Sequence, residues 1–258
     1  MKGFRQGIYL VPNLLTTGNL FSGFYAIVAV FNANYLHAAL AILIAMAFDF
    51  LDGKSARLTK TTSRFGVEYD SLADLVSFGV APGILIYSWA LSHFGRAGWV
   101  AAFLFVVCGA LRLARFNVQS GSGESKYFLG LPIPAAAGVI ASLVVLDLHI
   151  LRLGSEIKPF LILGFIYGLA FLMVSTFRYR SFKDFHLGNR KPFHVLVSAV
   201  LGIIVLAAAP QVMLFALFAG YALSGPAEQL SARVIRRIMR RPESTPGSTS
   251  STGPRSDA

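Results

Sequence analysis

Charged residues are scarce in this sequence: they make up 14% of its 258 residues, whereas a soluble globular domain has about 25%. Hydrophobic residues account for 55%, and the mean hydropathy is +0.63. Too few polar side chains are therefore available to cover a soluble domain of this length. This shortage excludes an ordinary soluble globular protein and predicts a chain that is solvated mainly by lipid.

Cysteine and acidic residues are also few. The single cysteine, Cys108, excludes an internal disulfide, and it lies in an apolar stretch where a thiol serves for packing. The 12 Asp and Glu residues face 23 Lys and Arg residues, which gives a formal net charge of +11. Nucleic acid is one possible partner for such an excess. In so apolar a chain, the sidedness of membrane insertion explains the excess better, and we expect no nucleic-acid partner.

Eight apolar runs approach or reach the roughly 20 residues that a helix needs to cross a bilayer. They are Pro12–Phe31, Leu36–Ala56, Leu72–Leu91, Gly98–Arg115, Pro134–Leu151, Pro159–Ser175, Phe193–Ala209 and Pro210–Leu223. As one helix, the last two would be about 45–50 Å long. Because this length exceeds the bilayer core and Pro210 breaks the run, we expect two short helices joined by a turn.

The basic residues predict the orientation of these spans. With the N-terminus inside, 20 of the 23 Lys and Arg residues lie on the inner side, and only Arg96, Arg152 and Lys158 lie outside. By the positive-inside rule, both termini are then cytoplasmic. We expect an all-α, polytopic helical bundle of about eight transmembrane helices in the cell (cytoplasmic) membrane. The first run is too long for a cleaved signal, so we expect it to remain as a helix.

Composition divides the chain into three regions. Residues 1–225 form the expected membrane domain. Residues 226–241 contain the basic amphipathic piece Ala232–Arg241, which we expect to rest on anionic membrane lipids. Residues 242–258 are rich in Ser, Thr, Pro and Gly, cannot build a core, and are expected to be disordered.

Five of the twelve acids crowd between Asp49 and Asp74. Asp49 and Asp52 end one apolar run, and Asp70 and Asp74 open the next; their i,i+3 and i,i+4 spacings put each pair on one helix face. In antiparallel helices the four carboxylates converge near the cytoplasmic interface, where they repel each other unless a hard divalent cation such as Mg²⁺, Mn²⁺ or Ca²⁺ binds them. Complementing a helix dipole is the alternative; it explains Asp70 alone, since Asp49 and Asp52 sit at a C-terminal end.

The segment between the two acidic pairs is basic and contains no acid. Gly53 lets the backbone approach a ligand, Ala56 leaves room beside Arg57, and Arg57 can bind a phosphate through two hydrogen bonds. A metal ion, an arginine and a backbone that a ligand can approach closely are together typical of phosphoryl-transfer sites. The alternative is that the cations of this segment, Lys54, Arg57, Lys60 and Arg64, only set the membrane orientation.

Eight positions in these 26 residues form one pattern, Asp49-x2-Asp52-Gly53-x2-Ala56-Arg57-x8-Gly66-x3-Asp70-x3-Asp74. This pattern resembles the signature of the CDP-alcohol phosphotransferase family. The resemblance implies an integral-membrane enzyme that moves a phosphatidyl group from CDP-diacylglycerol, or a phospho-alcohol from its CDP ester, onto an alcohol. It implies a divalent cofactor, Mg²⁺ or Mn²⁺, in a site that Ca²⁺ could also occupy.

The resemblance also implies roles for individual residues. Asp49, Asp52 and Asp70 would be metal ligands, and Asp74 would lie near the metal and act as the general base. The residues expected to contact the CDP moiety are Gly53, Ala56, Arg57, Gly66 and Ser63, together with Asn13 and Thr16 in a segment similar to the first helix of the family. For Asn13 and Thr16 the alternative is a place at headgroup level on a helix that begins at Pro12.

Within the family, the wider chain is similar to the branch that uses serine. The similar stretches are Val11–Ala26, Phe48–Gly83, Leu111–Asn117, Phe128–Gly138 and Met173–Phe185. This similarity implies CDP-diacylglycerol and L-serine as substrates and a homodimer as the assembly. A serine acceptor needs a partner for its carboxylate. Arg112 and Arg115, spaced i,i+3, and Asn117 are the candidates, with anchoring to lipid headgroups as the alternative.

Two other functions fit parts of the pattern. A sister transferase would use glycerol phosphate, inositol phosphate or choline as the acceptor. A divalent-cation transporter would use the same carboxylates, but transporters place ion sites near the midplane at broken helices. Here the acids flank a short basic segment, which favours the transferase.

Overall fold

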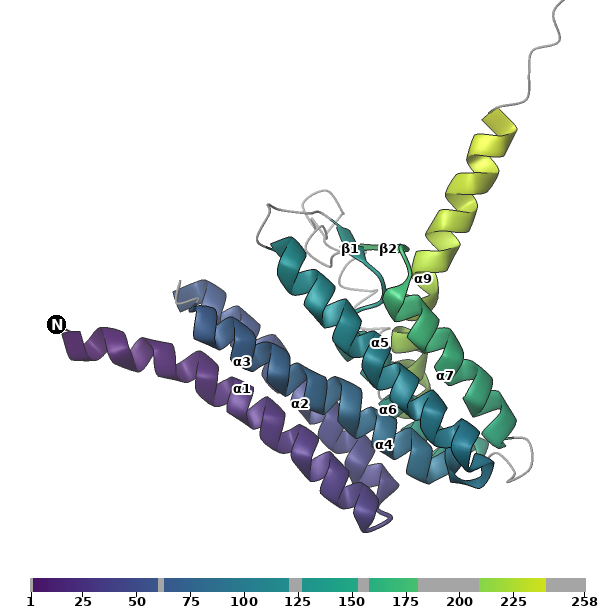
Figure 1. Cartoon of the computed structure of the whole chain (residues 1–258), viewed down its shortest axis with the longest axis horizontal. Helices are drawn as coiled ribbons and strands as arrows, with labels where there is room; N and C mark the ends of the chain where they lie inside the picture. Colours follow the sequence, from purple (N-terminus) through teal and green to yellow (C-terminus); the bar gives the residue numbers. More distant parts are fainter. Residues whose placement is uncertain (1, 60–62, 121–126, 153–157, 181–208, 240–258) are drawn as a thin grey trace, which may run out of the picture.

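The structure is a computed structural model that describes residues 2–59, 63–120, 127–152, 158–180 and 209–239 (Figure 1). Nearly all of these residues are helical. The helices are α1 (Lys2–Phe31), α2 (Tyr35–Thr59), α3 (Arg64–Asp74), η1 (Leu75–Val80), α4 (Ala81–Ile86), η2 (Tyr87–Leu91), η3 (Ser92–Phe94), α5 (Arg96–Ser120), α6 (Ile133–Leu146), η4 (Asp147–Leu151), α7 (Lys158–Val174) and α9 (Pro210–Met239). Two short strands, β1 (Tyr127–Leu129) and β2 (Arg178–Arg180), pair antiparallel.

Within the part of the chain that the structure describes, five helical segments are long and apolar enough to cross a membrane, which agrees with the expected membrane helical bundle. They are Val11–Phe31, Tyr35–Leu58, Arg64–Phe94, Arg96–Gln119 and Ile133–Leu151; Pro159–Val174 is a shorter apolar helix. The predicted span at residues 193–209 lies outside the described residues except for Ala209. The predicted span Pro210–Leu223 is the first part of α9. The count of eight spans and the orientation of the termini therefore stay predictions.

Prolines end fewer helices than the sequence suggested. Pro12 lies inside α1, so a helix beginning at this residue was a wrong expectation. A proline removes one backbone hydrogen bond, and here helix continues on both sides of it. Pro210 does begin α9, but Pro226 lies inside that helix, which crosses the boundary expected at residue 225 and continues to Met239. The tail at 242–258 is outside the described residues.

Asp49, Asp52 and Asp70 lie inside helices rather than at their ends, which corrects the sequence-based placement. Asp74 is the last residue of α3, and the chain continues from it directly into η1. α2 continues beyond Asp52 to Thr59. α3 begins at Arg64, where the Ser63 side chain caps the helix by accepting a hydrogen bond from the Gly66 amide at 2.9 Å. Asp70 is thus in the second turn of α3. Because the helix dipole acts within the first turn, complementing that dipole does not explain Asp70.

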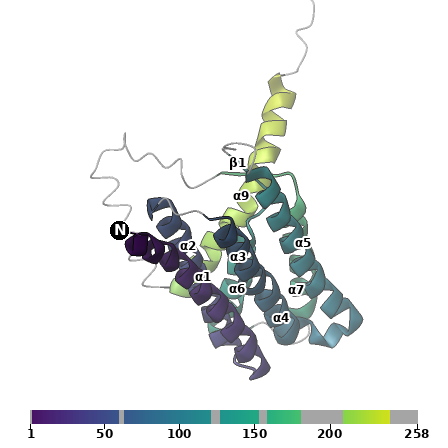
Figure 2. The same cartoon turned by 60° about the vertical axis from the view of Figure 1, so that its left-hand side comes forward.

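α1 packs along α2 and lies beside α3 and η1 (Figure 2). At the contact with η1, Gly23 faces Ser77: a β-carbon at Gly23 would lie 2.6 Å from the Ser77 Cα. The Ser77 hydroxyl donates a hydrogen bond to the Asn19 carbonyl at 3.0 Å. Small residues of this kind let membrane helices approach closely. The polar side of α1 is therefore held against the helix that carries Asp70 and Asp74.

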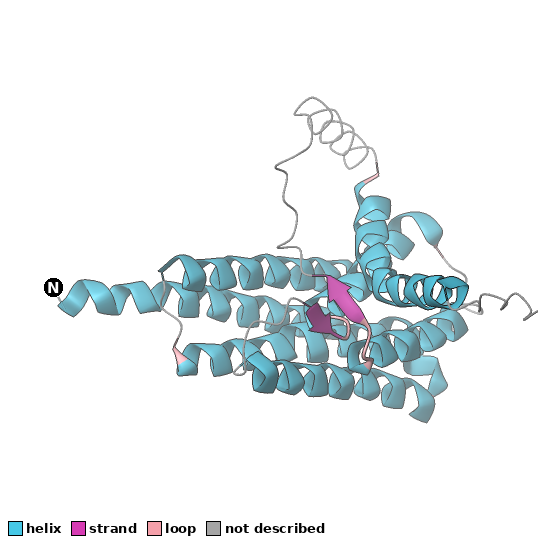
Figure 3. Ribbon diagram, turned by 90° about the horizontal axis from the view of Figure 1, so that it is seen from above, coloured by secondary structure: helices cyan, strands magenta, loops and turns pink. Residues whose placement is uncertain are grey.

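α6 forms the centre of the second half of the molecule, and every residue of it except Pro134 is buried. α2 and α9 pack against it, with the Phe218 ring of α9 over Gly138. Figure 3 shows the two strands lying across the helices, where β2 contacts α9. Cys108 of α5 is buried, as its apolar surroundings suggested.

Replacing Gly23 by alanine should destabilise the protein by about 1–3 kcal/mol, because the new methyl group overpacks the α1–η1 contact. The matched control is Gly164→Ala in α7, where a β-carbon meets no atom of the described residues within 4 Å. Thermal unfolding of the purified proteins in detergent measures the difference. Equal midpoints for the two variants would contradict the close contact.

Candidate active site

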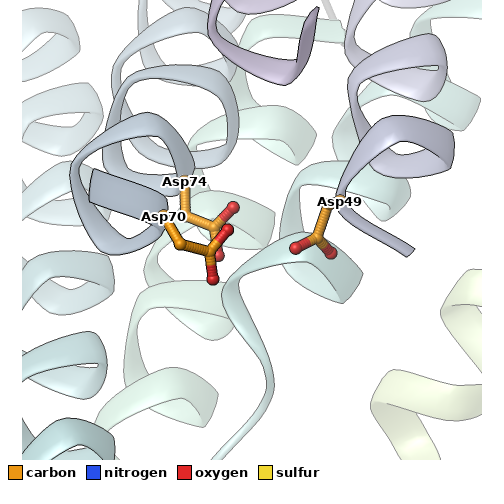
Figure 4. A group of neighbouring side chains, drawn as sticks. All are labelled: Asp49, Asp70 and Asp74. Carbon is orange, nitrogen blue, oxygen red and sulfur yellow. The ribbon is translucent and has the colours of Figure 1, made fainter. Parts of the chain in front are cut away.

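Three aspartates from two helices meet at the centre of the site. One carboxylate oxygen from each of Asp49, Asp70 and Asp74 lies within 4.8 Å of the other two. Figure 4 shows Asp70 and Asp74, one turn apart on α3, turned toward Asp49 on α2. The structure thus brings together three of the four acids that the sequence pattern singled out.

The fourth acid, Asp52, is held beside this group by α1. Its side chain is buried, and its Oδ2 accepts a hydrogen bond from the Thr16 hydroxyl at 3.0 Å. It lies close enough to Asp49 and Asp70 to repel both electrostatically. Four carboxylates therefore share one region, with three in a compact group and Asp52 at its edge.

Asp74 is the most tightly held of the compact group. It is buried, and its Oδ1 accepts a hydrogen bond from the Asn19 side-chain amide at 3.0 Å. Asn19 is itself fully buried. The sequence analysis did not select Asn19, although Asn13, Thr16 and Asn19 recur every three residues in an apolar run, which is a detectable signal of a polar helix face.

The chemistry of the carboxylate group fits a divalent cation. Asp70 Oδ1 is buried and has no hydrogen-bond partner among the described residues. An unpaired acid of this kind is costly within a membrane bundle. Hard cations such as Mg²⁺, Mn²⁺ and Ca²⁺ prefer oxygen ligands, and carboxylates supply them. The cluster of aspartates could therefore bind a metal ion. Its carboxylates alone do not discriminate between Mg²⁺, Mn²⁺ and Ca²⁺.

A cavity with about 470 Å³ of empty space, partly open to solvent, lies beside these acids. It is formed by α1, α2 and the start of α3, and both Asp52 and Asp70 line it. It also collects six of the seven residues that the resemblance assigned to the CDP moiety: Asn13, Thr16, Gly53, Ala56, Ser63 and Gly66. Residues from three helices, distant in sequence, thus surround one space.

Arg57 is the seventh residue, and it does not line the cavity. Its side chain is exposed, and its Nε donates a hydrogen bond to the Gly53 carbonyl one turn earlier at 2.8 Å. A long exposed side chain can change rotamer at little cost. Arg57 therefore directly follows the cavity residue Ala56 in the sequence, but its side chain is bonded to its own helix.

The three acceptor candidates on α5 have different surroundings. Arg112 is buried, its guanidinium lies 5.5 Å from the centre of the Phe116 ring, and it interacts electrostatically with Asp74. Arg115 donates instead to the Val174 carbonyl at the end of α7, at 3.2 Å. Asn117 donates to the Ser71 hydroxyl of α3, at 2.9 Å. Of the three, only Arg112 shows an interaction with the acidic group.

Comparison with known proteins identifies the same family that the residues of the site resemble. The family model of the CDP-alcohol phosphatidyltransferases matches residues 9–223, and the chain belongs to this family. The match includes α2, α3 and most of α1, the helices that form the cavity and the acidic group, together with residues 210–223 of α9.

Curated relatives carry more specific names. The chain is 45% identical over 178 residues to a CDP-diacylglycerol–serine O-phosphatidyltransferase of Helicobacter pylori, covering 68% of this chain and 74% of the relative. It is 38% identical over 173 residues to the enzyme of that name in Bacillus subtilis, covering 67% and 91%. It is 40% identical over 171 residues to an archaetidylserine synthase of Methanothermobacter thermautotrophicus, covering 66% and 69%.

Replacing Asn19 by leucine should weaken metal binding about 10- to 100-fold, the usual loss when a residue that supports a metal ligand is removed. The readout is the Mn²⁺ concentration that gives half of the maximal thermal stabilisation of the protein.

Asn32→Leu is the matched control, because Asn32, just after α1, is exposed and its side-chain amide donates, among the described residues, to the Val28 carbonyl of that helix. Should both variants need the same Mn²⁺ concentration as the unaltered protein, Asn19 does not support a metal ligand.

Proposed function

We propose that this protein transfers the phosphatidyl group of CDP-diacylglycerol to the hydroxyl of L-serine, giving phosphatidylserine and CMP. The observation that carries the proposal is the position of the acidic group beside a cavity lined by six of the seven residues that the family resemblance assigns to the CDP moiety. Family membership supports the CDP-alcohol chemistry. The names of the bacterial and archaeal relatives support serine as the acceptor.

The rival functions are less well supported. A sister transferase with glycerol phosphate, inositol phosphate or choline as the acceptor would share the cavity and the acids, but the relatives compared above are named for serine or archaetidylserine. Cation transport would use the carboxylates and leave the neighbouring cavity unexplained. The archaeal relative is named for archaetidylserine; for this chain we propose diacylglycerol.

Asp49, Asp70 and Asp74, with Asp52 at the edge, would hold a divalent cation, Mg²⁺ or Mn²⁺, in a site that Ca²⁺ could also enter. When bound, the cation would offset the negative charge of the diphosphate and stabilise the departing CMP. The family resemblance assigns Asp49, Asp52 and Asp70 to the metal. The compact group contains Asp74 in place of Asp52, so we propose that all four contribute.

Asp74 would act as the general base. It would take the proton of the serine hydroxyl, whose oxygen forms a bond to the lipid-bearing phosphorus while the bond from that phosphorus to CMP breaks. The Asn19 amide occupies one oxygen of Asp74 and restricts the orientation of the carboxylate. The other oxygen then remains for the cation and the acceptor, since one carboxylate oxygen can accept from two partners.

The cavity residues would bind the donor. Asn13, Thr16, Ser63 and the small residues Gly53, Ala56 and Gly66 would surround the CDP moiety. Arg57 would reach the diphosphate by leaving its hydrogen bond to Gly53. On the acceptor side, Arg112 would bind the serine carboxylate, while Arg115 and Asn117 hold α5 against α7 and α3.

For the whole protein we propose eight transmembrane helices with both termini in the cytoplasm, and an active site at the cytoplasmic face of the cell membrane. The basic segment at 226–241 would contact anionic lipids. The active assembly would be a homodimer, as the family resemblance implies.

An acceptor panel tests the proposed function. The purified protein, CDP-diacylglycerol and Mn²⁺ are incubated with serine, glycerol phosphate, inositol phosphate or choline, and CMP release is measured. We expect CMP with L-serine alone. Faster release with another acceptor would assign the chain to a sister activity. Metal uptake into vesicles without CMP release would favour transport.

Replacing Asp74 by asparagine should abolish turnover, since loss of a general base costs about 10²- to 10⁴-fold and a metal ligand is lost as well. Binding of CDP-diacylglycerol should be largely retained, because Asp74 does not line the cavity. Glu68→Gln, an exposed acid of the same helix, is the matched control. Normal turnover of the Asp74 variant would exclude Asp74 as the base.

A further inference from the structure

Arg112 is a buried cation with an unsatisfied donor. Its side chain is 7% exposed, and its Nε has no hydrogen-bond partner among the described residues. Burying a guanidinium without full compensation is costly. The Phe116 ring offsets part of this cost by a cation–π contact, and Asp74 attracts the group from α3. The free Nε donor indicates that an anion completes the site.

A second polar group that acts on Arg112 electrostatically belongs to α9. Tyr221 is half-buried and interacts electrostatically with the guanidinium. A phenolic hydroxyl can donate a hydrogen bond, and a carboxylate can accept one at each of its two oxygens. Arg112 and Tyr221 together can thus offer two donors to one anion, from α5 and α9.

Tyr179 of β2 fixes the position of Tyr221. The two rings lie 5.6 Å apart between centres, and the Tyr179 hydroxyl donates to the Ala222 carbonyl at 2.9 Å. A β-carbon at Gly225 would lie 2.5 Å from Cζ of Tyr179. The absence of a side chain at Gly225 therefore allows the Tyr179 ring to pack directly against α9. Burial raises the pKa of Tyr179, which keeps its hydroxyl protonated as a donor. The fully buried Tyr179 ring therefore contacts three residues within about one turn of α9: Tyr221, Ala222 and Gly225.

The position of this pair favours the acceptor over the nucleotide. The cavity that collects the CDP-binding candidates is lined by α1, α2 and α3, and neither Arg112 nor Tyr221 lines it. Arg112 is instead on α5. An anion at Arg112 is thus separate from the expected place of the nucleotide, which leaves the acceptor carboxylate as the better match. A lipid phosphate has similar chemistry, and the experiment below distinguishes the two.

We infer that Tyr221 is a specificity-determining residue: its hydroxyl binds the carboxylate of the acceptor amino acid together with Arg112, and Tyr179 is the positioning residue that holds it there. This inference rests on the proposed function. It assigns a role in acceptor choice to α9, a helix outside the family signature segment. Two donors on one carboxylate would disfavour an acceptor that has the hydroxyl and the amine but no negative charge.

Tyr221→Phe in the full-length protein tests the inference, because it removes only the hydroxyl. CMP release is measured with CDP-diacylglycerol and Mn²⁺ while L-serine or L-serinamide is varied. The KM for L-serine should rise about 10-fold, the usual effect of losing a hydrogen bond to a charged group. The KM for CDP-diacylglycerol, kcat and the thermal midpoint should stay within twofold of the unaltered protein. The preference for serine over serinamide should fall by the same factor as the serine KM rises.

The control is Tyr167→Phe, a partly exposed tyrosine of α7. A Tyr221 variant that matches this control in every constant overturns the inference. So does a rise in the KM for CDP-diacylglycerol without a rise for serine, which would assign the anion site to the lipid phosphate. If the unaltered protein releases no CMP with serine, the proposed function fails first, and the inference fails with it.

Discussion

The main physical constraint on this structure is the repulsion between carboxylates that lie together inside a membrane bundle and must be offset. Asp49, Asp70 and Asp74 bring oxygen atoms within 4.8 Å of each other, and Asp52 lies at their edge. In a low-dielectric interior, such an arrangement is costly without a compensating cation. The helices around the four acids therefore fix the positions of the carboxylates and leave room for the cation and the substrates.

α1 makes several of the contacts that fix these acids in position. Thr16 bonds to Asp52, and Asn19 bonds to Asp74, so one helix face holds two of the four acids. The Gly23 contact and the Ser77 hydrogen bond keep that face in register with η1. The same face contributes Asn13 and Thr16 to the neighbouring cavity. A change in α1 should therefore affect metal binding and nucleotide binding together.

Much of this site was predictable from the sequence, because the signature residues lie close together along the chain. Spacing alone placed Asp70 and Asp74 on one face, and the resemblance selected six of the cavity residues. Helix boundaries were less predictable: Asp52 and Pro12 looked like ends, yet neighbouring residues continue the helix through both. Long-range packing was beyond sequence reasoning, as Arg115 shows by bonding to α7 rather than facing the acids. Tyr221 was missed because its relation to Arg112 depends on how α9 packs.

The central claim is that the aspartates bind one divalent cation beside the CDP cavity. The most direct test is a structure of the protein with Mn²⁺ and CDP-diacylglycerol, in which anomalous scattering locates the metal. We predict a manganese peak between Asp49, Asp70 and Asp74, next to a diphosphate in the cavity lined by Asn13 and Gly66. A fully occupied complex with no manganese peak at these acids, or with the nucleotide bound elsewhere, would contradict the account.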